Sequence, residues 1–190
     1  MRNIAEAAQV ATGAAYYYYP SKEAIVMALY ERSCNEMQPE IRDALEGLDG
    51  LEERLRSLVQ VKLDYFKKDR AVLRALLRVG ADPKHPLSPF SAETRAIRDI
   101  DVEWFRKILT DCDIRIPKDL SPHLPDALWL FQMGIILFWV IDDSRGQART
   151  ARLLELGAKT VTSLVRLSAL PLTRPMRKTA LELIAIVKGE

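Results

Sequence analysis

Apolar residues recur along nearly the whole chain at spacings of three and four, and no stretch alternates apolar and polar residues long enough to predict a strand. Such spacing gathers the apolar side chains on one side of an α-helix. A clear example begins near Ser91 and contains Ile97, Ile100, Trp104, Phe105, Ile108 and Leu109. We therefore predict an all-α fold.

Composition limits the classes of protein that remain. The chain has 190 residues, of which 48% are hydrophobic, and a net charge of +2, so it has enough apolar surface for a core and little charge repulsion. This excludes a disordered chain, and the length fits one domain, or one domain with a small appendage. No charged leader followed by an apolar stretch opens the sequence, so we expect a cytoplasmic protein.

The cysteines and histidines form no pattern typical of a site. Cys34 and Cys112 lie far apart without CxxC spacing, and His85 and His123 are the only histidines. We therefore predict two reduced thiols, no metal site and no cofactor. The sequence also lacks GxGxxG, HExxH and GxSxG motifs, so we expect no enzymatic activity.

Capping residues and prolines divide the chain into helices. Ser21 is a good N-cap for a helix with Ile25 and Leu29 on one side. Pro39 falls inside this pattern, so the helix either kinks there or stops near Met37 and restarts. Further helices are expected over about 51–66, 70–79, 91–112, 127–141 and 148–170, with a shorter one towards 188 and loops over 80–89 and 113–125. The residues predicted to cap two of these helices are Asp49 and either Asp143 or Ser144.

The segment from Ala127 to Ile141 is apolar on every side except at Gln132. It is shorter than the ~20 residues that cross a bilayer, so it is predicted to be a helix inside a protein, with no membrane partner. A helix of this kind needs neighbours on more than one side. It either takes part in an interface between two copies of the chain or lies at the centre of a monomer core.

Two short helical segments open the chain. Residues 1–8 carry Ile4, Ala5 and Ala8 on one side, residues 9–11 form a tight connection, and residues 12–19 form the second segment, which Pro20 ends. Two short helices joined by about three residues are typical of a helix-turn-helix. In that geometry the second helix enters the major groove of DNA by its N-terminal residues.

Residues 2–24, which read RNIAEAAQVATGAAYYYYPSKEA, resemble the DNA-binding signature of the TetR family of bacterial transcriptional regulators. The family pattern is roughly R-x-I-A-x-x-A-G-V-S-x-G-T-hydrophobic-Y-x-H/Y-F-x-S-K-E-A; order and spacing agree over its whole length, and residue type agrees at all but four of the specified positions. Beyond Met27 the resemblance rests on the number and length of the helices. The family has a further helix ahead of the one that contains Arg2, so the resemblance implies a natural chain that is longer at its N-terminus.

The motif departs from the family pattern at four positions. Gln9 stands where the family prefers glycine, so it must adopt a positive φ at a cost in energy, or the turn must close differently. Ala11 and Ala14 replace the usual serine and threonine, which removes two hydroxyl groups that touch DNA. Tyr19 replaces phenylalanine conservatively.

The resemblance implies a set of DNA contacts. Lys22, in the first turn of the next helix, would hold a phosphate. Tyr17 and Tyr18 would face outward, where their hydroxyls donate to phosphate oxygens, whereas Tyr16 and Tyr19 would pack partly inward. The residues predicted to contact DNA are Arg2, Ala11, Thr12, Gly13, Ala14, Tyr16, Tyr17, Tyr18 and Lys22.

The resemblance also implies two domains: a DNA-binding domain over residues 1–28 and a helical ligand-binding and dimerisation domain over residues 29–190. The protein would bind operator DNA as a homodimer and be released by a small apolar effector, most often as a repressor. An effector pocket framed by the helices around residues 51, 104 and 129 is predicted to involve Lys62, Asp101, Trp104, Trp129, Gln132 and Met133. The predicted dimer interface comprises Ile135, Phe138, Trp139, Leu153, Val161 and Leu164.

A second hypothesis remains open: a helical ligand-binding or interaction protein that has lost DNA binding. It is supported by the neutral charge of the first 32 residues, because a DNA-binding face usually carries an excess of cations. The charged residues in this segment are Arg2, Lys22 and Arg32 against Glu6, Glu23 and Glu31.

Overall fold

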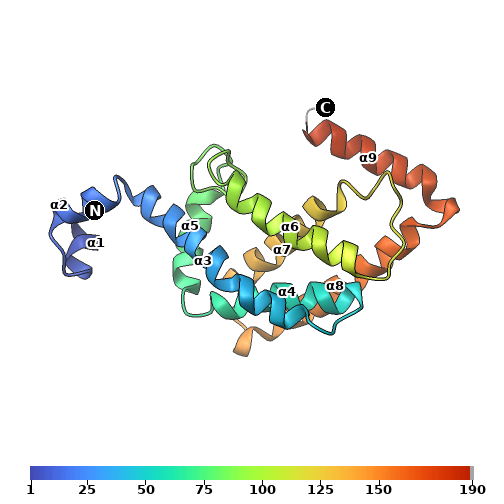
Figure 1. The fold of residues 1–190 in the computed structure, drawn as a ribbon, viewed down its shortest axis with the longest axis horizontal. Coiled ribbons are helices and arrows are strands. Elements are labelled where there is room, and N and C mark those ends of the chain that lie inside the picture. The colour runs from blue at the N-terminus through green and yellow to red at the C-terminus, as the bar shows by residue number, and fades with distance from the viewer. Residues whose placement is uncertain (189–190) are drawn as a thin grey trace.

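The computed structural model describes residues 1–188, and over this range the regular structure is helical, with no strand. Figure 1 shows α1 (Arg2–Ala7) and α2 (Thr12–Tyr18) at one end of the molecule, joined to the remaining helices through α3 (Lys22–Leu45). The body continues with α4 (Leu51–Tyr65), α5 (Arg70–Gly80), α6 (Arg95–Asp111), α7 (Leu124–Ile141) and α8 (Ala148–Ser168), and α9 (Arg174–Lys188) lies at the opposite end. The all-α prediction is confirmed.

Helix α3 is a single rod that runs from the first two helices into the body. Ser21 caps it as predicted, because its Oγ accepts a hydrogen bond of 3.1 Å from the amide of Ala24. Two alternatives were open at Pro39: a kink, or a stop followed by a restart. The helix neither stops nor restarts, because it continues through this residue to Leu45. The predicted boundary between residues 28 and 29 falls inside this continuous helix.

The core lies where α4 packs against α3 and α8, and where α6 packs against α7. Leu55, Leu58 and Val59 of α4 are completely buried, together with Phe105 and Ile108 of α6. Their spacing of three and four residues is the pattern that predicted these helices. The cap predicted at Asp49 is wrong: Gly50 is the N-cap of α4, and no side chain caps that end.

Helix α6 begins at Arg95, four residues later than predicted, because hydroxyl groups hold the preceding segment in turns. Ser88 Oγ donates to the carbonyl oxygen of Gly80 at 2.8 Å, and Ser91 Oγ donates to that of Pro86 at 3.0 Å. Thr94 Oγ1 donates to the carbonyl oxygen of Ser88 at 2.7 Å. These bonds satisfy buried polar groups locally and compete with an earlier start of the helix.

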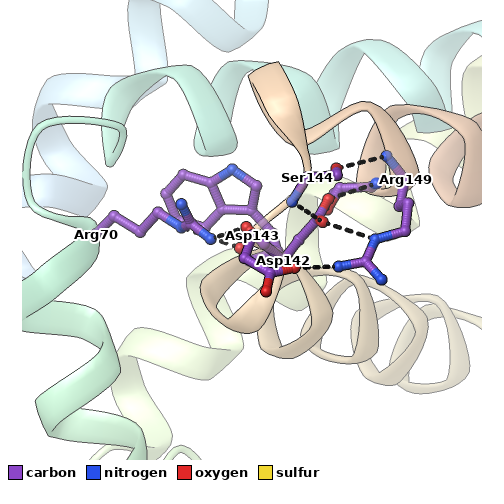
Figure 2. Close-up of polar contacts among 7 residues, drawn as sticks. Arg70, Asp142, Asp143, Ser144 and Arg149 are labelled. Carbon is purple, nitrogen blue, oxygen red and sulfur yellow. Dashed lines mark hydrogen bonds and ion pairs between the residues drawn. The ribbon is translucent and has the colours of Figure 1, made fainter.

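The corner between α7 and α8 is organised by Asp142, not by Asp143 (Figure 2). Asp142 is buried, and its Oδ2 accepts hydrogen bonds from the amide of Thr150 at 2.9 Å and from the hydroxyl of Thr150 at 2.7 Å. Its Oδ1 accepts from the amide of Ser144 at 3.0 Å and from Arg149 Nε at 3.1 Å. The cap predicted at Asp143 is therefore wrong, whereas Ser144 Oγ does accept a bond of 3.2 Å from the amide of Arg149.

Candidate DNA-binding surface and ligand cavity

Helices α1 and α2 form a compact helix-turn-helix. Ala5, the one side chain of this pair that is almost completely buried, lies where the helices meet, and its carbonyl oxygen accepts a hydrogen bond of 3.0 Å from the amide of Val10. Gln9 occupies the turn with φ of 56°, so it adopts the left-handed conformation that the family assigns to glycine. The turn therefore closes in the usual way, with strain at Gln9.

The residues predicted to contact DNA all lie on the surface of this unit. Tyr17 is 85% exposed and its ring meets that of Tyr18 edge to face, with 5.3 Å between centroids. Tyr16 and Tyr19 were expected to pack partly inward, but both are exposed, Tyr16 at 53% and Tyr19 at 39%. The exposed predicted residues are Arg2, Ala11, Thr12, Gly13, Ala14, Tyr16, Tyr17, Tyr18 and Lys22.

A cavity of about 150 Å³ lies in the body of the protein. Helices α3 to α7 and the segment that precedes α6 contribute to its wall. Five of the six residues predicted for an effector pocket line it: Lys62, Asp101, Trp129, Gln132 and Met133. The remaining wall is mostly apolar and includes Tyr30, Ser33, Cys34, Met37, Phe66, Leu73, Leu76, Leu77, Leu87, Pro89, Thr94, Ile97, Arg98 and Ile136.

Trp104 does not line this cavity, so its prediction is corrected. Asp101 is the last residue of α6 in the cavity wall, and Trp104 lies three residues further along, about 4.5 Å along the helix axis. Its ring instead lies 5.5 Å from Lys107 Nζ, in a separate surface hollow.

Three polar side chains meet in the wall of the cavity. Lys62 Nζ lies 2.7 Å from Asp101 Oδ1, and Gln132 Nε2 donates to Asp101 Oδ2 at 3.0 Å. Lys62 is 2% exposed and Gln132 is 0% exposed. Gln132 Oε1 has no hydrogen-bond partner among the described residues, and Lys62 Nζ has none beyond its ion pair.

Cys34 adds a thiol to the cavity wall that sequence reasoning did not single out. Burial raises the pKa of this thiol to about 11, with the negative charge of Asp101 adding to the shift and Lys62 opposing it. The thiol therefore stays protonated at neutral pH and behaves as a small apolar group with a weak donor. The residues around Cys34 give no indication in the sequence that this thiol lines a cavity, because its location depends on how α3 packs against distant helices.

Helices α7 and α8 each expose apolar residues along one side. The predicted interface residues Leu153 and Leu164 are exposed, and Phe138 and Val161 are half-buried. Ile135 and Trp139 are 3% and 4% exposed within a single chain, so their assignment to an interface is wrong. Other large apolar residues exposed on these two helices, which were not predicted for the interface, are Leu130, Leu137, Ile141, Leu156 and Leu167.

Helix α7 is also long and apolar enough, by length and composition, to cross a membrane. The core helix of a soluble protein meets the same criterion, and 44% of α7 is buried inside the protein. Its buried side packs in the core through Leu128 and Ile135.

A surface helix-turn-helix joined by one long helix to a cavity-bearing helical body defines a transcriptional regulator of the helix-turn-helix class. Residues 1–29 match the family described as bacterial regulatory proteins, tetR family, and residues 54–179 match the tetracyclin repressor-like C-terminal domain. The chain therefore belongs to the TetR family, whose members are regulators and not enzymes. The chain matches no curated protein.

Proposed function

We propose that this regulator is a cytoplasmic repressor that binds operator DNA as a homodimer and releases it when a small, mostly apolar molecule occupies the cavity. Residues 1–28 bind DNA, and residues 29–190 bind the ligand and form the dimer. No membrane takes part.

The continuity of α3 is the observation that carries this proposal. Tyr30, Cys34 and Met37 of α3 line the cavity, and the same helix begins at Lys22, immediately after the helix-turn-helix. Lys22 lies 12 residues before Cys34, about 18 Å along the helix, so a tilt of about 10° at the cavity moves the DNA-binding unit by about 3 Å. A ligand in the cavity contacts α3 directly and can therefore tilt this helix.

Such a movement matters because of the spacing that DNA imposes. Two recognition helices of a dimer must occupy half-sites about 34 Å apart, one turn of the duplex. Displacing each unit by about 3 Å changes that spacing by an appreciable part of the groove width of about 12 Å. The ligand needs to prefer the displaced state by several kcal/mol to switch the protein effectively.

The exposed apolar sides of α7 and α8 support dimer formation. Leu137, Leu153 and Leu164 are large apolar side chains that a single chain leaves in water. An exposed apolar patch spanning two long helices is typical of an interface between subunits. In the dimer these helices pack against their symmetry-related copies as a four-helix bundle.

On DNA, α2 contributes few contacts to base edges. Thr12 offers a hydroxyl and a methyl group, whereas Gly13 and Ala14 offer only close approach and apolar contact. Sequence preference therefore depends largely on DNA shape and on phosphate contacts by Tyr17 and Lys22.

The full chain is tested by selection of duplexes from a random pool, followed by fluorescence anisotropy with the enriched sequence. We expect two-fold symmetric half-sites one helical turn apart and two chains bound per duplex. Failure to enrich any sequence would instead support a ligand-binding protein that has lost DNA binding, which the neutral charge of residues 1–32 favours.

A further inference from the structure

The polar cluster in the cavity wall leaves one acceptor and one donor group without a hydrogen-bond partner among the described residues. A carboxylate only accepts hydrogen bonds, so Asp101 fixes the amide of Gln132 with Nε2 towards it and Oε1 away from it. Gln132 Oε1 is then a buried acceptor without a partner among the described residues. Lys62 carries three N–H groups, and its one ion pair among the described residues joins Nζ to Asp101 Oδ1 at 2.7 Å.

The charges around Gln132 disfavour an ionised group on the ligand, and Arg98, another cation in the cavity wall, donates instead to the carbonyl oxygens of Pro89 and Ser91. Lys62 and Asp101 already neutralise one another. A carboxylate on the ligand would accept from Lys62 but would be repelled by Asp101 and by the lone pairs of Gln132 Oε1. An ammonium would satisfy Gln132 but would be repelled by Lys62. A neutral hydroxyl is the smallest group that donates to Gln132 Oε1 and accepts from Lys62 Nζ at once.

The size and lining of the cavity limit the rest of the ligand. Its volume is about 150 Å³. An engineered apolar cavity of about 150 Å³ in another protein binds benzene, so this volume accommodates a single ring. Phe66, Trp129 and Met133 offer aromatic and thioether surfaces to such a ring.

We propose that the ligand is an uncharged one-ring aromatic alcohol, of which a phenol is the simplest form, with its hydroxyl between Gln132 Oε1 and Lys62 Nζ. This names the ligand class of the cavity and rests on the proposed function for its regulatory meaning. The ring lies among Phe66, Trp129 and Met133, and the Cys34 thiol contributes to the apolar wall without reacting.

Titration calorimetry on the full chain without DNA tests the proposal with four compounds of matched shape: 4-methylphenol, 1,4-xylene, 4-methylbenzoate and 4-methylbenzylammonium. We expect 4-methylphenol to bind at least about 10-fold more tightly than 1,4-xylene, because the hydrocarbon leaves Gln132 Oε1 unpaired. Both ions should bind more weakly than 4-methylphenol. Equal or tighter binding of 1,4-xylene or of either ion overturns the proposal.

The variant Gln132→Leu removes the acceptor, and it should reverse the preference so that 1,4-xylene binds more tightly than 4-methylphenol. The matched control is Gln60→Leu, the same substitution at an exposed site on α4, which should keep the wild-type preference. An unchanged preference in Gln132→Leu shows that the hydroxyl does not reach this residue. If Gln132→Leu fails to fold, the four-compound series on the wild type decides the matter alone.

A separate titration of the protein–DNA complex distinguishes this proposal from the proposed function. Binding of 4-methylphenol without any release of DNA contradicts ligand-induced release and leaves the ligand class intact. Release of DNA by 1,4-xylene, with no binding of 4-methylphenol, supports ligand-induced release and contradicts the aromatic alcohol as the ligand class.

Discussion

Arg70 of α5 holds the last turn of α7 through Trp139: its Nε donates to the carbonyl oxygen of Trp139 at 3.1 Å, and its guanidinium carbon lies 5.6 Å from the centroid of that indole. A second nitrogen of the same guanidinium donates to the carbonyl oxygen of Asp142 (Figure 2). Carbonyl groups at a helix C-terminus lack partners within the helix, and a cation there also complements the helix dipole. This contact connects α5, a wall of the cavity, to the corner from which α8 begins.

Replacing Arg70 by methionine should lower the free energy of unfolding by about 2 kcal/mol, because charged hydrogen bonds to two carbonyl groups and the contact with Trp139 are lost. The control is Arg74→Met, one turn further along α5, where the side chain is exposed. Urea unfolding at one fixed protein concentration measures both. Equal stability of the two variants would mean that the Arg70 contacts contribute nothing measurable.

The buried carboxyl of Asp142 gives the α7–α8 corner a dependence on pH. Burial raises the pKa of Asp142, but hydrogen bonds from Ser144 and Thr150 outweigh this effect and hold the pKa well below its usual range. A carboxyl whose pKa is depressed by folding stabilises the protein above its unfolded pKa of about 3.9, and this stabilisation is lost as the pH falls through that value towards the folded pKa.

Asp142→Asn removes this titration, so the melting temperature of the variant should fall less steeply than that of the wild type between about pH 5 and pH 3. Asp143→Asn, at the exposed neighbouring position, serves as the control and should keep the wild-type slope. Thermal unfolding followed by circular dichroism across this range gives the three slopes. A wild-type slope in Asp142→Asn would show that other carboxyl groups dominate.

The sequence predicted the helices well because helical periodicity and capping are local properties. Ser21 and the four-residue spacing of Met37, Ile41 and Leu45 need no knowledge of distant segments. The start of α6 was misplaced because the Ser91 hydroxyl donates back to the carbonyl oxygen of Pro86, a contact that depends on the path of the preceding loop.

The sites were predicted unevenly for a related reason. Lys62, Asp101 and Gln132 stand out as polar residues on apolar stripes, so pattern alone marked them. Helix α7 is apolar on nearly every side and has no polar face to show which side meets solvent, so Ile135 and Trp139 were assigned outward although both are buried. The contributions of α3 and α5 to the cavity depend on packing between distant segments, which periodicity does not encode.

Two glutamines occupy left-handed backbone conformations that glycine adopts more easily. Gln9 has φ of 56° and Gln147 has φ of 52°. Gln9→Gly and Gln147→Gly should each raise the stability of the surrounding turn by up to about 1 kcal/mol. Gln60→Gly, inside α4, should instead lower stability by about 1 kcal/mol. Hydrogen exchange of the amides around each site reports these changes, and protection that falls in Gln9→Gly would contradict strain at this turn.

The proposed interface predicts opposite effects for exposed and buried residues of α7. Leu137→Asp should weaken dimer formation at least about 100-fold without unfolding the chain, because the new charge would be buried only between subunits. Ile135→Asp should unfold the protein, since Ile135 is already buried in one chain. Sedimentation velocity measures the first effect, with Val72→Asp at an exposed site on α5 as its control. A dimer that tolerates Leu137→Asp as well as Val72→Asp places the interface elsewhere.

Lys22 provides the sharpest test of the DNA-binding surface, because its proposed phosphate contact carries a defined electrostatic signature. Each cation that neutralises a phosphate releases a condensed counterion, so Lys22→Ala should lower the slope of log Kd against log salt concentration by about 1 per chain, or about 2 for a dimer. The affinity should fall by a similar factor for every duplex tested, because phosphate contacts carry no sequence information. Lys118→Ala, at an exposed site before α7, should change neither quantity. Tyr18→Phe should reduce the affinity and leave the slope unchanged, because a phenolic hydroxyl binds phosphate without displacing a counterion. If Lys22→Ala keeps the wild-type slope, Lys22 does not contact a phosphate. If the slope falls by 1 and not by 2, a single chain binds the duplex.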